Sequence, residues 1–328
     1  MTKNTFYFFF AFLLSLPFFM GINTVSSTVE DTYFLAELSK NPEVLTAATA
    51  NAALQSSFFE EQPFRDTSVP LTEVFANAAF SLYVNGQGNT NVLFAKNQHE
   101  ALPIASLTKL MTALVVEKYY PPEELITVTK EAIQKEENTG NFRAGEQFLV
   151  KDLLHSLLIE SSNDAAAAFA LYWGRDTFLH AMNEEAEKLS LEHTSFVDEA
   201  GVDPNEGEFI NRATAKDLAE LSRFVLENHP EVFSLLSMTS AELKTADGKL
   251  HHTVRTTNDL LISNGWETKV LGGKTGWTPK ANGCLLLILE SPDKKGYLVN
   301  VVLGADDRFA EMKTMVNWVL DAYEWKQP

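Results

Sequence analysis

Ser106 and Lys109 stand three positions apart at the start of a segment whose apolar residues recur with helical periodicity to about Lys118. One helical turn separates them, so both side chains lie on one face with Cβ atoms about 5–6 Å apart. A serine becomes a nucleophile when a base takes its proton, and a desolvated, neutral lysine is such a base. The N-terminus of the helix adds free N–H groups that favour a developing oxyanion. The pattern therefore predicts a nucleophile and its base.

The same spacing also has a purely structural interpretation, in which Ser106 caps a surface helix and Lys109 points into water. Ser291 and Lys294 repeat the spacing inside a polar turn. The pattern alone does not identify an active site, and the catalytic interpretation depends on partners elsewhere in the chain.

Ser161 and Asn163 are one candidate pair of partners, in a polar segment between two predicted helices. A hydroxyl and an amide two residues apart on an extended or turn backbone can point into one cleft, where they could relay a proton and bind a substrate amide. Serine and asparagine are also the residues that begin a helix, so a capping role is the alternative.

Residues 272–278, Gly-Gly-Lys-Thr-Gly-Trp-Thr, are the second candidate. Glycines weaken a strand unless something must approach its backbone closely. Lys274 and Thr275 could hold a carboxylate by charge and hydrogen bond, and an extended peptide could pair with the strand itself. A glycine-rich hairpin with an exposed lysine is the alternative.

Composition limits the class of protein. The 328 residues suffice for one large domain or two small ones, and the net charge of −18 argues against nucleic acid or an anionic membrane surface as a partner. The single cysteine, Cys284, excludes an intramolecular disulfide and is expected to be a small buried residue. No His-Glu-x-x-His spacing occurs, so no metal is predicted, and His251 and His252 are expected on the polar surface.

Residues 1–27 are predicted to be a signal peptide or an N-terminal membrane anchor, because Lys3 precedes an apolar segment of about 17 residues. The rest of the chain is then expected outside the cytoplasm. Residues 28–70 are predicted to be a spacer, with helix-like composition up to the break at residues 60–63. Residues 71–328 are predicted to be the catalytic domain.

Within residues 71–328 the predicted strands lie at the two ends and the predicted helices lie mostly between them. Strands are expected at residues 79–84, 91–95, 125–129, 267–273, 283–290 and 297–304, and helices at 106–118, 150–160, 165–171, 176–190, 214–228, 230–238 and 307–325. This order predicts an α+β domain in which N- and C-terminal segments share one antiparallel sheet packed with a helical subdomain.

The three motifs, Ser106-x-x-Lys109, Ser161-x-Asn163 and Lys274-Thr275-Gly276, resemble in this order those of the serine penicillin-recognising enzymes. The sequence around them, at residues 105–113, 161–166, 200–203, 214–219 and 272–278, is similar to the D-alanyl-D-alanine carboxypeptidase family of low-molecular-weight penicillin-binding proteins. The resemblance covers about residues 70–328.

The resemblance implies a role for each matching position. Ser106 would attack the D-Ala-D-Ala carbonyl to form an acyl-enzyme, with Lys109 as its base, and Ser161 and Lys274 would relay a proton to the leaving D-Ala. The resemblance also gives substrate-binding roles to Asn163, which would hold the peptide; Thr275, which would hold the terminal carboxylate with Lys274; Gly276; and Trp277, whose backbone N–H would complete the oxyanion hole with that of Ser106. Trp277 stands where many relatives carry histidine.

The partners that the resemblance implies are peptidoglycan stem peptides as substrate and β-lactam antibiotics as inhibitors, with no cofactor. Three other functions stay open at this point: a peptidoglycan DD-endopeptidase, a class A-like β-lactamase and an inactive binding homologue. A β-lactamase needs a carboxylate to activate the deacylating water. Glu199 and Glu206 lie in the corresponding region, but neither is followed by Leu-Asn.

Overall fold

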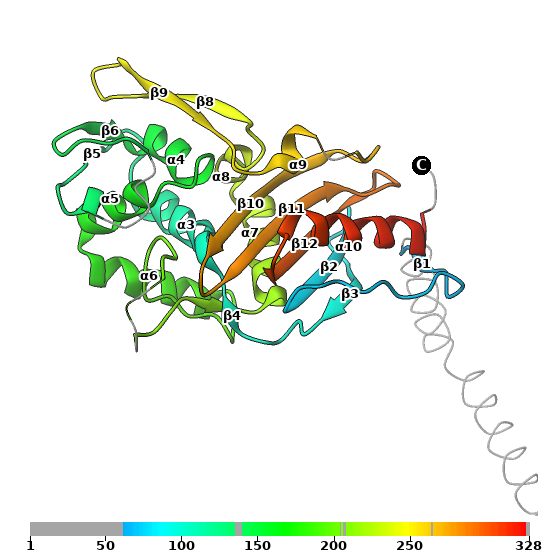
Figure 1. Cartoon of the computed structure of the whole chain (residues 1–328). Helices are drawn as coiled ribbons and strands as arrows, with labels where there is room; N and C mark the ends of the chain where they lie inside the picture. Colours follow the sequence, from blue (N-terminus) through cyan, green and yellow to red (C-terminus); the bar gives the residue numbers. More distant parts are fainter. Residues whose placement is uncertain (1–61, 135–139, 204, 206–207, 264, 326–328) are drawn as a thin grey trace, which may run out of the picture. The chain divides into compact units, whose positions relative to one another are not determined.

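The structure is a computed structural model that describes residues 62–134, 140–203, 205, 208–263 and 265–325 (Figure 1). From Pro63 onwards they belong to one compact unit. β1 (Phe64–Arg65), in the segment predicted to be a spacer, pairs within this unit with β13 (Tyr323–Glu324). The predicted leader at residues 1–27, and all but the end of the predicted spacer, lie outside the described residues.

A five-stranded antiparallel sheet forms the centre of this unit, and the predicted fold class is confirmed. Its strand order is β10-β11-β12-β2-β3. The strands are β2 (Ala78–Asn85), β3 (Thr90–Lys96), β10 (Val270–Thr278), β11 (Asn282–Glu290) and β12 (Gly296–Ala305). The N-terminal hairpin thus completes a sheet that the C-terminal strands begin, and β10 lies at an edge.

Helices cover both faces of the sheet (Figure 1). α10 (Arg308–Ala322) packs on one face, and α7 (Ala215–Asn228) packs on the other against β2 and β12. Alternate residues of β11 serve the two cores: Leu286 and Ile288 join the core on the α7 side, whereas Leu285 and Leu287 join the core with α10. Successive residues of β11 face opposite sides of the sheet, and both sides are buried. The sequence of β11 is therefore apolar without interruption.

The helical subdomain lies beside the β10 edge (Figure 1). It contains η1 (Ala105–Thr108), α3 (Lys109–Tyr119), α4 (Val150–Leu158), α5 (Asn163–Trp173) and α6 (Arg175–Lys188), with α8 (Pro230–Leu235) next to α3 and α4. Buried leucines on one face of α4, at positions 153, 154, 157 and 158, fix its orientation as their spacing predicted. Among the described residues, no helix combines the length and the apolar character that crossing a bilayer requires.

Short pieces complete the unit: β4 (Leu102–Pro103) with β7 (Arg212–Ala213), β5 (Leu125–Thr127) with β6 (Gln147–Leu149), η2 (Ala132–Gln134) and α9 (Asp259–Ile262). The hairpin of β8 (Ser240–Lys244) and β9 (Leu250–Arg255) was not predicted. The strand predicted at residues 267–273 begins and ends later in the structure, so the whole segment 272–278 lies within β10.

Candidate active site

Ser106 and Lys109 sit where the 3₁₀ turn η1 leads into α3. The helix predicted from residue 106 therefore begins with one tight turn, and Lys109 is the first residue of the α-helix. Neighbouring buried residues, among them Leu107 and Leu110, anchor the turn in the core. The Lys109 side chain is fully buried, and its Nζ lies 2.7 Å from Ser106 Oγ. This is the reach that a base needs to take a proton from its nucleophile.

Two further contacts hold the Lys109 amine in place. Its Nζ donates to Asn163 Oδ1 at 2.7 Å and to the backbone O of Ala200 at 2.8 Å. Both partners only accept at these atoms, so they occupy two hydrogens of the amine. When Lys109 is neutral, its lone pair is then left to face the Ser106 hydroxyl. The arrangement orients a base and does not merely place a charge.

Ser161 and Lys274 form a second hydroxyl–amine pair. Lys274 Nζ donates to Ser161 Oγ at 2.7 Å and to the backbone O of Thr275 at 2.8 Å. Burial of the Lys274 amine, and secondarily the positive charges of Lys109 and Arg308, hold the pKa of Lys274 well below its ordinary value. A lysine in this environment exchanges its proton far more readily than an exposed one. The shift also shows that the amines of Lys109 and Lys274 lie close enough to interact.

The edge strand β10 runs directly against the turn that carries Ser106. A Cβ at Gly276 would lie 3.0 Å from the backbone N of Ser106 and 3.1 Å from the backbone O of Ile104. Only glycine lets the two backbones approach this closely. Thr275 Oγ1 hydrogen-bonds to Thr257 Oγ1, and the Trp277 side chain is 50% exposed at the mouth of the site. The predicted residues of β10 thus line one side of Ser106.

A loop that the sequence did not assign a role supports Lys109 from behind. The Asp198 carboxylate accepts hydrogen bonds from the backbone N of Ala200 and Gly201, at 2.8 and 2.7 Å, which fixes the carbonyl that binds Lys109. Asn211 donates to the backbone O of Asp198 at 2.7 Å and to Thr108 Oγ1 at 3.0 Å. Asp198 also pairs with Arg175 at 2.7 Å. These supports come from loop residues without periodicity, so no spacing rule could reveal them.

Arg308 and Cys284 flank the site on the sheet side. Arg308, at the start of α10, is half-buried, and its Nε is buried without a hydrogen-bond partner among the described residues. Cys284 is fully buried, as predicted, and burial raises the pKa of its thiol to about 11. Cys284 is therefore an inert packing residue, whereas Arg308 is a cation beside Lys274.

Two alternative kinds of site can be compared with the described residues: a metal site, and the activating carboxylate of a β-lactamase. Within the described part of the chain, no cluster of three or more His, Cys, Asp or Glu side chains is arranged to hold a metal ion. Glu199 is buried, and its carboxylate pairs with Arg175 at 3.0 Å. Glu206 lies outside the described residues. The structure thus brings together residues from η1, α3, the α4–α5 loop, α5 and β10: Ser106, Lys109, Ser161, Asn163, Lys274 and the 275–277 segment.

Comparisons with known proteins point to one family. Residues 68–307 match the family described as D-alanyl-D-alanine carboxypeptidase. The D-alanyl-D-alanine carboxypeptidase DacD of Escherichia coli K12 is 34% identical over 255 residues, covering 72% of this chain and 60% of the relative. The D-alanyl-D-alanine endopeptidase of Pseudomonas aeruginosa is 30% identical over 288 residues, 84% of each chain. The chain therefore spans about three fifths of the first relative and most of the second.

Solved structures agree with the assignment of the fold. Penicillin-binding protein D2 from Listeria monocytogenes, in a cefotaxime-bound form, matches with a TM-score of 0.64 and 27% identity over 77% of this chain and 98% of that one. A penicillin-binding protein homologue from Mycobacterium tuberculosis has a TM-score of 0.70 at 24% identity, covering 81% and 98% of the two chains. The second likeness concerns the fold alone.

Proposed function

The chain belongs to the D-alanyl-D-alanine carboxypeptidase family, and on that premise we propose that it is a serine peptidase that cleaves the D-Ala-D-Ala bond of peptidoglycan stem peptides. The observation that carries the proposal is the pair of short hydroxyl–amine contacts, Ser106–Lys109 and Ser161–Lys274, each 2.7 Å long. Two buried lysines on two serines supply one group to activate a nucleophile and another to protonate a leaving amine.

In the first half of the reaction, Ser106 Oγ attacks the carbonyl carbon and its proton passes to Lys109 Nζ. The resulting oxyanion is stabilised by the backbone N–H groups of Ser106 and Trp277, which the close approach of β10 to η1 supports. The C–N bond then breaks. Lys274 supplies a proton through Ser161 Oγ to the departing D-Ala amine, and an ester on Ser106 remains.

Before the second half, the proton that Lys109 took from Ser106 replaces the one that Lys274 gave up, so Lys109 is neutral again. Water then attacks the ester carbonyl and gives a proton to Lys109, which passes it to Ser106 Oγ as the ester bond breaks and the shortened peptide leaves. Asn163 orients both the base and the peptide amide, because its Oδ1 binds Lys109 while its NH₂ group is a donor. Thr275, Lys274 and Arg308 provide the polar and positive groups for the terminal carboxylate. β10 offers an edge along which an extended peptide can add as a strand.

Carboxypeptidase and endopeptidase action use the same residues and differ in the leaving group, which is free D-alanine in one and a cross-linked peptide in the other. Relatives carry both names, so both are candidates for this chain. We expect penicillins to acylate Ser106, since a β-lactam amide is opened by the same attack. We also propose that the enzyme works outside the cytoplasm, secreted or held at the membrane by residues 1–27, because an apolar segment follows Lys3 there.

The test is intact-mass analysis of the full-length chain after incubation with penicillin, beside Ser106→Ala. The expected result is a stable one-to-one adduct on the wild type that the variant lacks. Hydrolysed penicillin without an adduct would favour a β-lactamase, and intact penicillin with a folded, unmodified protein would favour an inactive homologue. Release of free D-alanine from a pentapeptide, against cleavage of a cross-linked dimer, then separates carboxypeptidase from endopeptidase action.

A further inference from the structure

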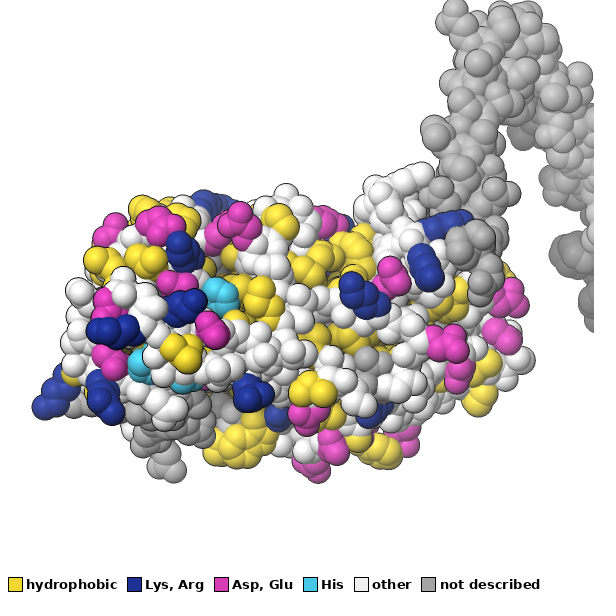
Figure 2. Space-filling model, turned by 90° about the horizontal axis from the view of Figure 1, so that it is seen from above, with side chains coloured by type: hydrophobic (Ala, Val, Ile, Leu, Met, Phe, Trp, Pro, Cys, Tyr) yellow, Lys and Arg dark blue, Asp and Glu magenta, His cyan; other side chains and the backbone are white. Residues whose placement is uncertain are grey.

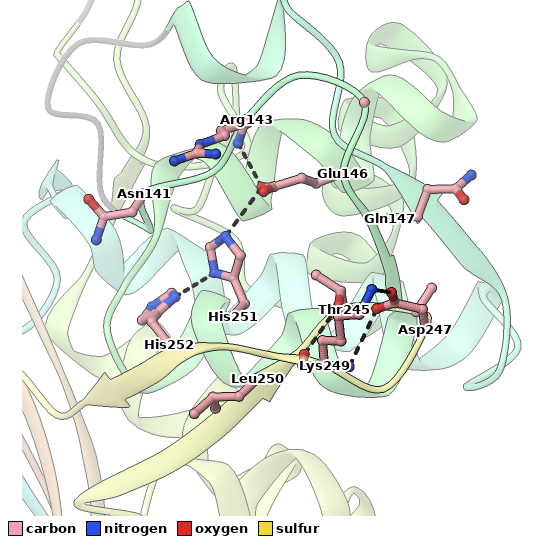
Figure 3. Close-up of a pocket in the computed structure, with 12 residues that line it drawn as sticks. Asn141, Arg143, Glu146, Gln147, Thr245, Asp247, Lys249, Leu250, His251 and His252 are labelled. Carbon is pink, nitrogen blue, oxygen red and sulfur yellow. Dashed lines mark hydrogen bonds and ion pairs between the residues drawn. The ribbon is translucent and has the colours of Figure 1, made fainter.

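A polar cavity of about 810 Å³ lies between the segment 141–147 and the β8–β9 hairpin (Figure 3). Figure 2 shows charged side chains of both signs and histidines gathered over this end of the unit. The sequence predicted His251 and His252 to be simple surface residues, and the structure contradicts this. Their side chains are only 12% and 20% exposed, and both line the cavity.

The two histidines link two carboxylates in an unbroken row, which we call the Glu–His–His–Glu chain. His251 Nε2 lies 3.2 Å from Glu146 Oε2, and His251 Nδ1 lies 2.7 Å from His252 Nδ1. His252 Nε2 lies 3.0 and 3.1 Å from the two oxygens of Glu160. Phe142 stacks on the His251 ring with the ring centroids 5.5 Å apart, which limits the motion of that ring. Side chains from three separate elements are thus tied together.

The number of protons in this chain follows from its geometry. Each of its three links joins two atoms that can both accept, so each link needs one proton to be a hydrogen bond. With both carboxylates ionised, each Nε2 carries a proton and one of the two Nδ1 atoms carries the third. Two imidazoles with three protons are one imidazolium and one neutral ring. A fourth proton, or the loss of the third, breaks at least one link.

The Glu160 end of the Glu–His–His–Glu chain adjoins the proposed catalytic residues. Glu160 directly precedes Ser161, and its Oε1 also accepts from Ser156 Oγ at 2.6 Å. Ser161 has φ of +66°, in the left-handed region that a non-glycine residue occupies only when its surroundings hold it there. Fixing the residue before Ser161 therefore fixes where the Ser161 hydroxyl meets Lys274.

We propose that His252, which His251 holds in place, is a positioning residue for Ser161. The Glu–His–His–Glu chain fixes Glu160, and with it Ser161, only while the chain holds three protons. The inference deepens the proposed function and rests on it. It makes acylation of Ser106 depend on pH through groups that never touch substrate. The gain of a fourth proton and the loss of the third belong to the coupled Glu–His–His–Glu chain and not to either ring.

Other charged and titratable groups lie on the same elements. Arg143, Asp247 and Lys249 line the same cavity. The neighbouring elements also carry Lys151, Asp152 and His155 on α4, Glu242 and Lys244 on β8, and Arg255 on β9. Asp247 and Lys249 form an ion pair at 2.6 Å, and Glu242 and Lys244 form one at 3.3 Å. Arg143 places a further positive charge at the cavity.

The experiment compares His252→Ala and His252→Gln with the wild-type full-length chain, by the rate of penicillin acylation between pH 5 and 9. Glutamine can still donate to Glu160 but does not titrate in this range. We expect alanine to slow acylation by about tenfold, within the range that small misplacement of a catalytic group causes. We expect His252→Gln to keep most of the acylation rate at neutral pH. The ratio of the wild-type rate to the His252→Gln rate should pass through a maximum and fall at both lower and higher pH.

His155→Ala is the matched control, because His155 lies on α4 and its Nδ1 meets the backbone oxygens of Lys151 and Asp152. It should follow the wild type at every pH. The inference is overturned if His252→Ala acylates at the wild-type rate, if the glutamine profile runs parallel to the wild type, or if His155→Ala changes the profile equally. A wild type that forms no adduct would instead refute the proposed function.

Imidazole ¹⁵N chemical shifts provide a readout that does not depend on activity. At the pH where acylation is fastest, the spectrum should show one protonated and one bare Nδ1 for the two rings, with both Nε2 atoms protonated. Two bare or two protonated Nδ1 atoms would contradict the three-proton chain, even in a fully active enzyme.

Discussion

Gly276 is the residue at which the edge strand and the nucleophile come closest, and Gly276→Ala tests whether this approach sets the reaction geometry. The added Cβ would lie 3.0 Å from the backbone N of Ser106, 3.1 Å from Ala105 Cβ and 3.1 Å from the backbone O of Ile104. Favourable contacts between heavy atoms lie near 3.5–4.0 Å. All three neighbours belong to the turn that carries Ser106, so β10 and η1 must separate by about 0.5 Å to restore such contacts.

The size of the effect follows from that displacement. Misplacing a reacting group by 1 Å can slow a reaction about a hundredfold, so half of that distance should slow penicillin acylation roughly tenfold. This corresponds to about 1.4 kcal/mol of transition-state stabilisation. Overpacking should also lower the free energy of unfolding, by about 1–3 kcal/mol. A measured loss of stability alone would not reveal whether the mutation also disturbs the geometry of the reaction.

Gly272→Ala separates them, because it lies on the same strand but faces other neighbours. Its Cβ would lie 3.1 Å from Phe233 Cζ and 3.3 Å from the backbone O of Leu236. Acylation is followed as the growth of the penicillin adduct by intact mass, and stability by thermal unfolding of the same samples. We expect both variants to lose stability and only Gly276→Ala to lose acylation rate. Equal acylation by Gly276→Ala and the wild type would refute the reasoning.

Three further predictions concern single groups. Burial raises the pKa of the Asp164 carboxyl to about 6, so the native state keeps a proton that the unfolded chain has lost, and stability falls as pH rises from about 4 to 6. Asp164→Asn should therefore raise the unfolding temperature at pH 8 and change it little at pH 4, and the same increment at both values would contradict this. The buried Cys284 thiol, with its raised pKa, should resist iodoacetamide at pH 8 in the native protein and react fully in denaturant, as mass spectrometry can measure. Arg308→Ala should raise KM for peptides with a free C-terminal carboxylate about tenfold, as expected for a lost charged hydrogen bond; an unchanged KM would remove Arg308 from substrate binding.

The sequence was most informative where a periodic or ordered pattern carries the signal. Leucines at helical spacing predicted α4. The alternation in β2 and the continuous apolar segment of β11 predicted strands in the places where the structure has them. The three motifs, taken in order, predicted which residues meet beside Ser106. Each motif alone also had a structural interpretation, and the functional one depended on all three meeting in one fold.

The features that the sequence did not reveal depend on contacts between segments without a shared pattern. The β8–β9 hairpin is short and largely polar and pairs only with itself, so its strands resemble loops. Asp198 and Asn211 support the carbonyl that binds Lys109 from positions 13 residues apart in irregular chain. The link from His252 to Glu160 spans 92 residues. No local spacing rule reaches that far.

The two hydroxyl–amine pairs share a backbone feature that explains why such distant supports are needed. Ser161 has φ of +66°, and Ala105, directly before Ser106, has φ of +46°. Neither is glycine, so each conformation costs roughly 1–2 kcal/mol. Ala105 is held by Gly201, which packs so closely that a Cβ there would lie 2.0 Å from the backbone O of Ala105.

Each strained residue therefore needs a rigid contact from a distant segment. Gly201 provides it for the nucleophile, and the side chains around Glu160 provide it for the proton relay. Both amines are also buried beside one another, which adds a second local cost. A site of this kind can persist only where a large, fully packed sheet supplies the stability that the site itself lacks. This accounts for the placement of both serines next to β10 and not on the outer surface of the helical subdomain.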